Sequence, residues 1–490
     1  MRGLSALAWF VVLGGIAPLI VIASAPLEPT LLICGAVVAH CAAALAAVLT
    51  SRRIQPMQFG FWAFAYLFLG LAPLAQVSRA TYPTGTDFLP DISVVAIAIV
   101  ELGLLAFSFG MWLAGNRPPP VHSRLESLFT ARALSQTGVV VAIVVSVLLF
   151  VVLLPHFGGL GTFFASRQAS NQAVAAYQSS SENSTATGAL INWGLSIPPL
   201  WALLGLLALR PGLSSGSSDA VGPTRRMRRL GRLFALVRHL PIWFWTGIVV
   251  AVTLNVIVNN PISQPRFWAG TVLLSLIFRA RRLRRPTVFR FAAASILFLL
   301  LVVFPYSDYF RYQKTESVAV TSLSQQLVDN NDYDAFVQIE AGVDYINRFG
   351  FSPKAGLGPV FFWVPRSVWH GKPSETGGVL SRDNGYTLTN RSAPMWIEAY
   401  LWGGVGVVVV WFALIGYLER RLDDIYDAAR DRDGLLIHSV VPVFAFFQLI
   451  VLRGSLLQAT GPFVMLLVIP LLMSRRVAIV DAAARARKHR

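Results

Sequence analysis

Arginines beside apolar segments are the side chains best suited to chemistry in this sequence. Arg266 and Arg453 lie in very short turns between apolar stretches. Arg366, Lys372 and Arg391 lie together in one long segment that also carries aromatic residues. Arginine binds phosphate oxygens through two parallel hydrogen bonds and stays charged wherever it is placed. These cations are therefore suited to a lipid-linked pyrophosphate at a membrane surface, with contact to ordinary lipid headgroups as the alternative.

Glu398 is the acidic residue with the most informative position, because apolar and aromatic residues surround it in Met395–Leu401. A carboxylate in an apolar span is costly unless it is paired or used. Glu398 therefore either forms a structural pair with a nearby arginine or takes part in chemistry. The sequence contains no paired acidic motif of the Asp-Asp-x-Asp kind that would indicate a metal site.

The composition indicates which elements must position these residues. Of the 490 residues, 55% are hydrophobic and 13% are charged, whereas about a quarter of an ordinary soluble domain is charged. The apolar residues form blocks close to the length of about 20 residues that crosses a bilayer. This pattern excludes a soluble globular enzyme, intrinsic disorder and a disulfide scaffold, because Cys34 and Cys41 share one apolar block.

The apolar blocks predict an all-α integral membrane protein with about twelve transmembrane helices. The expected spans lie near residues 4–24, 31–50, 57–77, 92–114, 138–155, 188–209, 241–258, 267–279, 288–306, 394–418, 434–452 and 456–473. Phe267 and Trp268 are expected to anchor the short eighth span at the outer interface. The net charge of +17 would suggest nucleic acid in a soluble protein. Most Lys and Arg instead fall in alternate loops, which places both termini in the cytoplasm and predicts no nucleic-acid partner.

Four regions follow from this topology. Residues 1–306 hold nine spans, a long outer loop at 156–187 and a basic cytoplasmic loop at 210–239; residues 307–393 form a large extracytoplasmic segment; residues 394–473 hold three spans; residues 474–490 form a basic cytoplasmic tail. Within the large segment, the apolar spacing over Leu323–Phe349 predicts a helix on the outer surface. The run Val360–Pro365 is too short to span and is expected to lie at the interface or to re-enter the membrane.

Scattered polar residues inside the spans raise the alternative of a transporter, which places its substrate site at mid-membrane. They are His40, Glu101, Asn192, Asn255, His438 and Gln448. Such residues more often bridge helices than line a pathway. The sequence therefore favours chemistry at one face of the membrane.

Several outer segments together resemble the oligosaccharide repeat unit polymerases, the Wzy-type O-antigen polymerase family. The resemblance rests on Gly358–Pro365, Trp369–Pro373, Ser392–Pro394, Glu398–Tyr400 and Gly403–Gly406, with Gly158–Leu160, Arg167, Asn260–Pro261, Arg266 and Arg453–Gly454. The layout agrees as well, with many spans and two enlarged outer loops that carry arginine.

The resemblance implies a GT-C-like, metal-independent membrane glycosyltransferase without a cofactor. It would polymerise undecaprenyl-pyrophosphate-linked oligosaccharides on the outer face of the cell membrane, with a chain-length regulator and a flippase as possible partners. Such chemistry needs a base near the acceptor hydroxyl and positive charge at the leaving group. The expected pyrophosphate ligands are Arg266, Arg366, Arg391 and Arg453, followed by Arg167, Arg348 and Lys372; the expected bases are Glu398, Asp383 and His370.

Two other functions remain open from the sequence. One is a flippase or exporter of the same lipid-linked glycan. The other is an O-antigen-ligase-type glycan transferase, although related ligases carry a histidine where this chain reads Asn390-Arg391-Ser392. His370 is the only histidine of the large outer segment.

Overall fold

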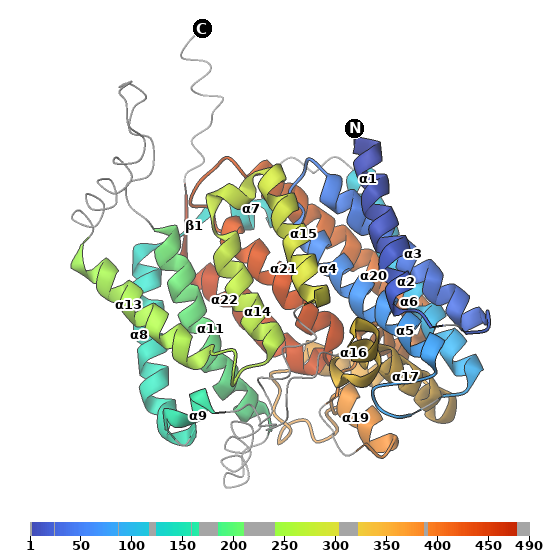
Figure 1. The fold of residues 1–490 in the computed structure, drawn as a ribbon. Coiled ribbons are helices and arrows are strands. Elements are labelled where there is room, and N and C mark those ends of the chain that lie inside the picture. Colours follow the sequence, from blue (N-terminus) through green and yellow to red (C-terminus); the bar gives the residue numbers. More distant parts are fainter. Residues whose placement is uncertain are drawn as a thin grey trace.

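A computed structural model of the chain defines the architecture (Figure 1). It describes residues 2–23, 25–86, 88–116, 124–157, 159–165, 185–209, 241–302, 322–386 and 391–477, with the backbone alone at 2, 124–125, 156–157 and 185–192. Loop 210–239 and Arg167 lie outside the described residues, as do most of loop 156–187 and of the basic tail.

Seven helices among the described residues are long and apolar enough to cross a membrane. They are α1 (Arg2–Val11) continued by η1 (Val12–Ile16) and α2 (Ala17–Val21), α3 (Pro29–Thr50), α4 (Pro56–Phe64) continued by η2 (Ala65–Leu71) and α5 (Ala72–Arg79), α6 (Pro90–Asn116), α8 (Gln136–Leu153), α20 (Met395–Ala428) and α22 (Leu456–Leu472). Five further helices contribute shorter apolar stretches, namely α11 (Thr185–Ala208), α13 (Ile242–Val258), α14 (Arg266–Phe278), α15 (Pro286–Val302) and α21 (Ile437–Arg453). The prediction of an α-helical membrane protein is thus confirmed, while the count of twelve spans stays a prediction.

Short elements connect these helices. They are α7 (Arg124–Thr130), η3 (Leu154–Phe157), α9 (Gly161–Phe164), η4 (Arg281–Arg284), α16 (Leu323–Asp329), η6 (Asn331–Tyr333), α17 (Ala335–Phe349), α18 (Pro353–Val360) and α19 (Thr376–Asp383). In the described part of the chain the only sheet pairs β1 (Arg132–Leu134) with β2 (Ser474–Arg476) in antiparallel register.

The connections separate into two ends of the bundle, as an alternating topology requires. At one end, at the top of Figure 1, the β1–β2 sheet adjoins Leu435 in the connection from α20 to α21, and Arg284 contacts Asp433 at 2.7 Å in the same connection. At the other end, which we call the site end, α16, α17 and α19 gather at the bottom of Figure 1. The described parts of the basic loops that were predicted to share the inner side therefore lie at the same end of the bundle.

Helix α20 packs along α6 at very short range, because glycine replaces a side chain where the two backbones meet. A Cβ at Gly110 would overlap the carbonyl of Ala413, and a Cβ at Gly416 would overlap the carbonyl of Phe107. Small residues let helix backbones approach in this way. Helices α6 and α20 are therefore held closely together in the bundle.

Helix α20 is broken near its start, at Gly403 and Gly404. Gly404 has φ 70°, in the left-handed region that glycine adopts without a Cβ penalty. Residues 395–402 consequently form a separate short helix. This short helix is enclosed by neighbours: Trp396 donates to the Val100 carbonyl at 3.1 Å, and Ile397 packs on Gly342 of α17.

Two expectations for the site end need correction. The predicted helix over Leu323–Phe349 is divided into α16, η6 and α17. Residues Ala335–Val343 of α17 are all buried, because they pack against α6 and α20 instead of lying on the surface. Trp268 is also buried: its indole donates to Asn259 at 2.8 Å and its ring packs on Trp193, so it does not anchor an outer interface. Val360 and Trp363 are both exposed, in accord with an interface-lying run.

Candidate functional site

Three of the predicted arginines come together at the site end from three different elements. Arg266 is the first residue of α14, Arg453 is the last residue of α21, and Arg391 lies four residues before α20. All three face η6 and the residue after it. The point where they meet carries two carboxylates, those of Asp332 and Asp334.

The ion pairs link each arginine to one or both acids. Arg266 pairs with Asp332, and Arg453 lies 3.5 Å from Asp332 and 3.2 Å from Asp334. Arg391 lies 3.9 Å from Asp334 and donates to the Asn331 side chain at 3.2 Å. We call Arg266, Arg391 and Arg453 the arginine triad.

The main chain of η6 also holds Arg453. Its guanidinium donates to the carbonyls of Asp332 at 3.1 Å and Asn331 at 3.3 Å. The same guanidinium lies over the ring of Phe267, 5.3 Å from the centroid. Arg391 stacks similarly on Tyr386 at 4.4 Å. A planar guanidinium can donate forked hydrogen bonds and stack on a ring at the same time, and an ammonium group cannot.

Burial makes the acid pair unusual. Asp334 is 2% exposed, and this burial raises its pKa above the ordinary value of 3.8. The nearby Asp332 charge acts in the same direction, while Arg453, the Ser392 hydroxyl and Arg391 oppose it. The carboxyl is held by Ser392, whose hydroxyl donates to it at 2.6 Å.

Backbone contacts fix Arg391 and Arg453 relative to each other. The amide of Ala393 donates to the Arg453 carbonyl at 3.1 Å. On the other side of Arg391, a Cβ at Gly377 would overlap the Arg391 carbonyl. The segment before α20 is therefore clamped between the end of α21 and the start of α19.

Glu398 lies next to this clamp, and its carboxylate is held by hydrogen-bond donors of other segments. One carboxylate oxygen accepts hydrogen bonds from Thr376 at 2.7 Å and Ser455 at 3.1 Å, and the other accepts from the Leu456 amide at 2.7 Å. Glu398 is 2% exposed. Within the described residues these neutral donors stand in place of the expected arginine partner, and the carboxylate ties α19 and α20 to the first turn of α22.

Arg366 and Lys372 form a separate unit in the loop after α18. Lys372 donates to the carbonyls of Phe362 at 2.7 Å and Val364 at 2.8 Å, while Arg366 donates to the carbonyls of Lys372 at 2.7 Å and Pro373 at 3.1 Å. Burial, followed by the Arg366 charge, lowers the pKa of Lys372. These two cations brace their own loop.

Of the remaining predicted residues, those that the structure describes have other partners than the triad. Arg348 pairs with Asp383 and with Asp344, the latter at 2.7 Å. The hydrogen bond to Asp383 is the main cause that raises the pKa of Arg348. His370 is exposed in a turn. The structure thus brings together three of the seven predicted anion ligands.

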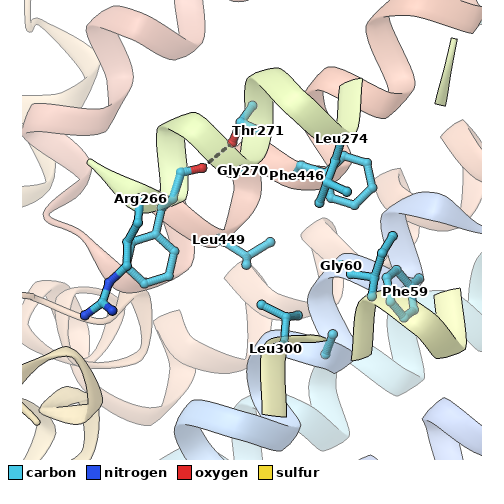
Figure 2. Close-up of a pocket in the computed structure, with 12 residues that line it drawn as sticks. Phe59, Gly60, Arg266, Gly270, Thr271, Leu274, Leu300, Phe446 and Leu449 are labelled. Atoms are coloured by element: carbon cyan, nitrogen blue, oxygen red, sulfur yellow. Dashed lines mark hydrogen bonds between the residues drawn. The ribbon is translucent and has the colours of Figure 1, made fainter. Parts of the chain in front are cut away.

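An apolar pocket begins at Arg266 and continues between α4, α14, α15 and α21 (Figure 2). Its volume is about 490 Å³ including its mouth. The lining residues are Phe59, Gly60, Ala63, Arg266, Phe267, Gly270, Thr271, Leu274, Ile296, Leu300, Phe446 and Leu449. Figure 2 shows Arg266 at one end of the pocket, with its guanidinium directed away from Leu274 and Phe446 at the other end.

Sequence reasoning missed the residues that organise the triad. Asp332 and Asp334 occur in a run of alternating polar residues, Asp329–Asp334, which reads as a solvated turn. Thr376 and Ser455 likewise carry no signal of their own. Only the acid content of that run could have indicated a counter-charge for outer arginines.

The polar residues inside the spans whose side chains are described, which excludes Asn192, bridge helices as expected. His40 contacts Glu101 at 2.9 Å between α3 and α6, Asn255 donates to the Pro199 carbonyl at 2.8 Å, and Gln448 donates to the Met57 carbonyl at 2.7 Å. No group of three or more potential metal ligands occurs within the described ranges.

No family model matches the chain, and neither the curated proteins nor the solved structures give a significant match.

Proposed function

We propose that the chain is a membrane glycosyltransferase that polymerises lipid-linked oligosaccharides, with the arginine triad as its pyrophosphate site. The observation that carries this proposal is the convergence of Arg266, Arg391 and Arg453 from three distant segments at one end of an apolar bundle. Three guanidiniums face two carboxylates there, which leaves more positive than negative groups, and guanidinium groups bind phosphate oxygens through paired hydrogen bonds. The resemblance of the outer segments to Wzy-type polymerases agrees with this assignment.

The reaction has simple requirements. The hydroxyl oxygen of an acceptor sugar attacks the anomeric carbon of the donor glycan, and the bond from that carbon to the pyrophosphate breaks. Negative charge then grows on the leaving undecaprenyl pyrophosphate, which the triad stabilises. The hydroxyl proton passes to a base, for which the exposed His370 and Asp383, partly buried and paired with Arg348, stay the candidates.

Glu398 has a positioning role in this scheme. Its three hydrogen bonds hold Thr376, Ser455 and Leu456, and Ser455 is two residues from Arg453. Loss of the carboxylate would release the start of α22 and, with it, the end of α21.

The proposal includes the membrane arrangement. The chain has twelve spans in the cell membrane, with both termini in the cytoplasm and the site end outside. The basic end of the bundle then faces the cytoplasm, as the positive-inside rule predicts. A chain-length regulator and a flippase are its proposed partners.

Reconstitution tests the function. The purified protein receives the host's undecaprenyl-pyrophosphate repeat unit without nucleotide sugar, and products are separated on a gel. We expect a ladder of lengths from the wild type. Arg453→Lys should reduce the ladder at least about tenfold, because an ammonium cannot reproduce the forked contacts of Arg453. Arg382→Lys, at an exposed arginine of α19, is the matched control and should leave the ladder unchanged.

Other outcomes contradict the proposal in distinct ways. A single transfer to a foreign acceptor would indicate a ligase. Movement of the intact lipid across liposomes without transfer would indicate a flippase. A full ladder from Arg453→Lys would show that the triad is not the pyrophosphate site.

A further inference from the structure

We infer that the apolar pocket behind Arg266 holds the first isoprenoid units of the lipid carrier. The inference rests on the proposed function and names the place where the donor's tail leaves the pyrophosphate site. The pocket, rather than the open surface, would then select a lipid with a phosphate head and a branched apolar chain.

The residues that line the pocket have the polarity expected for a lipid site. Apart from Arg266 and Thr271, its lining residues are apolar. The Thr271 hydroxyl is used within its own helix, where it donates to the Phe267 carbonyl at 2.8 Å. The pocket therefore offers a single charged group at one end and hydrocarbon elsewhere, which is the polarity of a lipid phosphate.

The extent of the pocket also suits an isoprenoid chain. The lining residues of α14 extend from Arg266 to Leu274, which is about 12 Å of helix at 1.5 Å per residue. Small residues line the space on two helices, Gly60 and Ala63 on α4 and Gly270 on α14. The lining thus extends along the helix and leaves room beside it, as a methyl-branched chain requires.

The surroundings of the pocket give a tail its route to the membrane. Leu273 of α14 and Leu299 of α15 flank the lining residues and are exposed on the apolar surface. A tail that starts at Arg266 can continue between these two helices into lipid. Charge complementarity at Arg266 then distinguishes the carrier from a neutral lipid.

Gly270 allows a specific test, because a Cβ at this position meets nothing within 4 Å. Gly270→Leu adds a side chain at a lining position of the pocket where its first carbon has room. Gly35→Leu is the matched control, since Gly35 of α3 also has open space around its Cβ and is exposed away from the pocket. Apparent melting temperatures should stay close to the wild type for both variants.

The experiment measures the binding of farnesyl pyrophosphate and of inorganic pyrophosphate to the purified protein in amphipol. Gly270→Leu should weaken the binding of farnesyl pyrophosphate by about tenfold or more, because buried apolar contacts are lost. It should leave the binding of inorganic pyrophosphate unchanged. Arg266→Gln should weaken the binding of both ligands. Gly35→Leu should change neither.

Three results would overturn the inference. Gly270→Leu could bind both ligands like the wild type, or could lose the binding of both equally. Either result would show that the tail does not occupy this pocket. Equal competition by dodecyl phosphate would show a general lipid groove instead of an isoprenoid site. Failure of the wild type to bind either pyrophosphate compound would instead contradict the proposed function itself.

Discussion

Arg453 and Asp334 are 119 residues apart in the chain and 3.2 Å apart in the folded protein. Arg453 is the last residue of α21, and Asp334 directly precedes the buried helix α17. Their contact joins the two elements at the site end and places Arg453 between Asp334 and Asp332. The charge of the arginine triad is therefore partly balanced by the protein's own carboxylates, with which a bound pyrophosphate would compete.

Asp332→Asn tests this competition. The variant removes the carboxylate that pairs with Arg266 and Arg453 while its shape is kept. We expect tighter binding of inorganic pyrophosphate, by about tenfold, because the anion no longer competes with an internal charge. Calorimetric titration measures the dissociation constant, and Asp329→Asn, an exposed acid of the same segment, is the control. Weaker binding to Asp332→Asn would mean that Asp332 helps to hold the ligand.

Glu398→Gln and Glu398→Ala separate a positioning role from a catalytic one. The glutamine can accept from the Leu456 amide, while Thr376 and Ser455 turn their hydroxyls to accept from its amino group. We expect Glu398→Gln to lose about 1 kcal/mol of stability and to keep most of its transfer, whereas Glu398→Ala leaves three donors without an acceptor and loses about 3 kcal/mol or more. Thermal melting and the product ladder are the two measurements. A glutamine variant that melts like the wild type but makes no polymer would identify Glu398 as the base.

Gly404→Ala tests the break in α20. A side chain at φ 70° costs about 1–2 kcal/mol, and its Cβ would also press on the Phe351 ring at 3.3 Å. We expect a lower apparent melting temperature and reduced transfer, because residues 395–402 lose their orientation. Gly406→Ala, two residues later with open space around its Cβ, should behave like the wild type. Equal melting of the two variants would show that the break does not constrain the site.

The raised pKa of Asp334 predicts that the stability of the protein depends on pH. Its pKa is raised in the folded protein, chiefly by burial, so the native state binds this proton more tightly than the unfolded chain does. The stability contributed by this proton is present below the ordinary pKa of 3.8 and is lost as the pH rises through the raised value. The melting temperature of the wild type relative to Asp334→Asn should therefore increase as the pH is lowered across this window. A difference that is constant with pH, or that decreases on acidification, would contradict the shift.

The sequence by itself determined the membrane class and predicted which loops share a side. Both follow from local properties: about 20 apolar residues must form a helix in lipid, and clusters such as Arg279–Arg285 mark one side. The helical spacing of Leu323–Phe349 likewise predicted the helical character of α16 and α17, but not the break at η6 between them. The short connections at Arg266 and Arg453 had indicated two of the three arginines that meet in the triad.

Only the tertiary structure decided which charges meet. Asp332 and Asp334 pair with arginines from α14, α21 and the segment before α20, and no local pattern encodes contacts between segments so far apart. Arg366 and Lys372 looked equivalent to the triad in sequence, yet their loop turns back so that each donates to nearby carbonyls. The burial of Glu398 depended on how α19, α20 and α22 pack, because a carboxylate's surroundings are set by its neighbours in space and not by its neighbours in the chain.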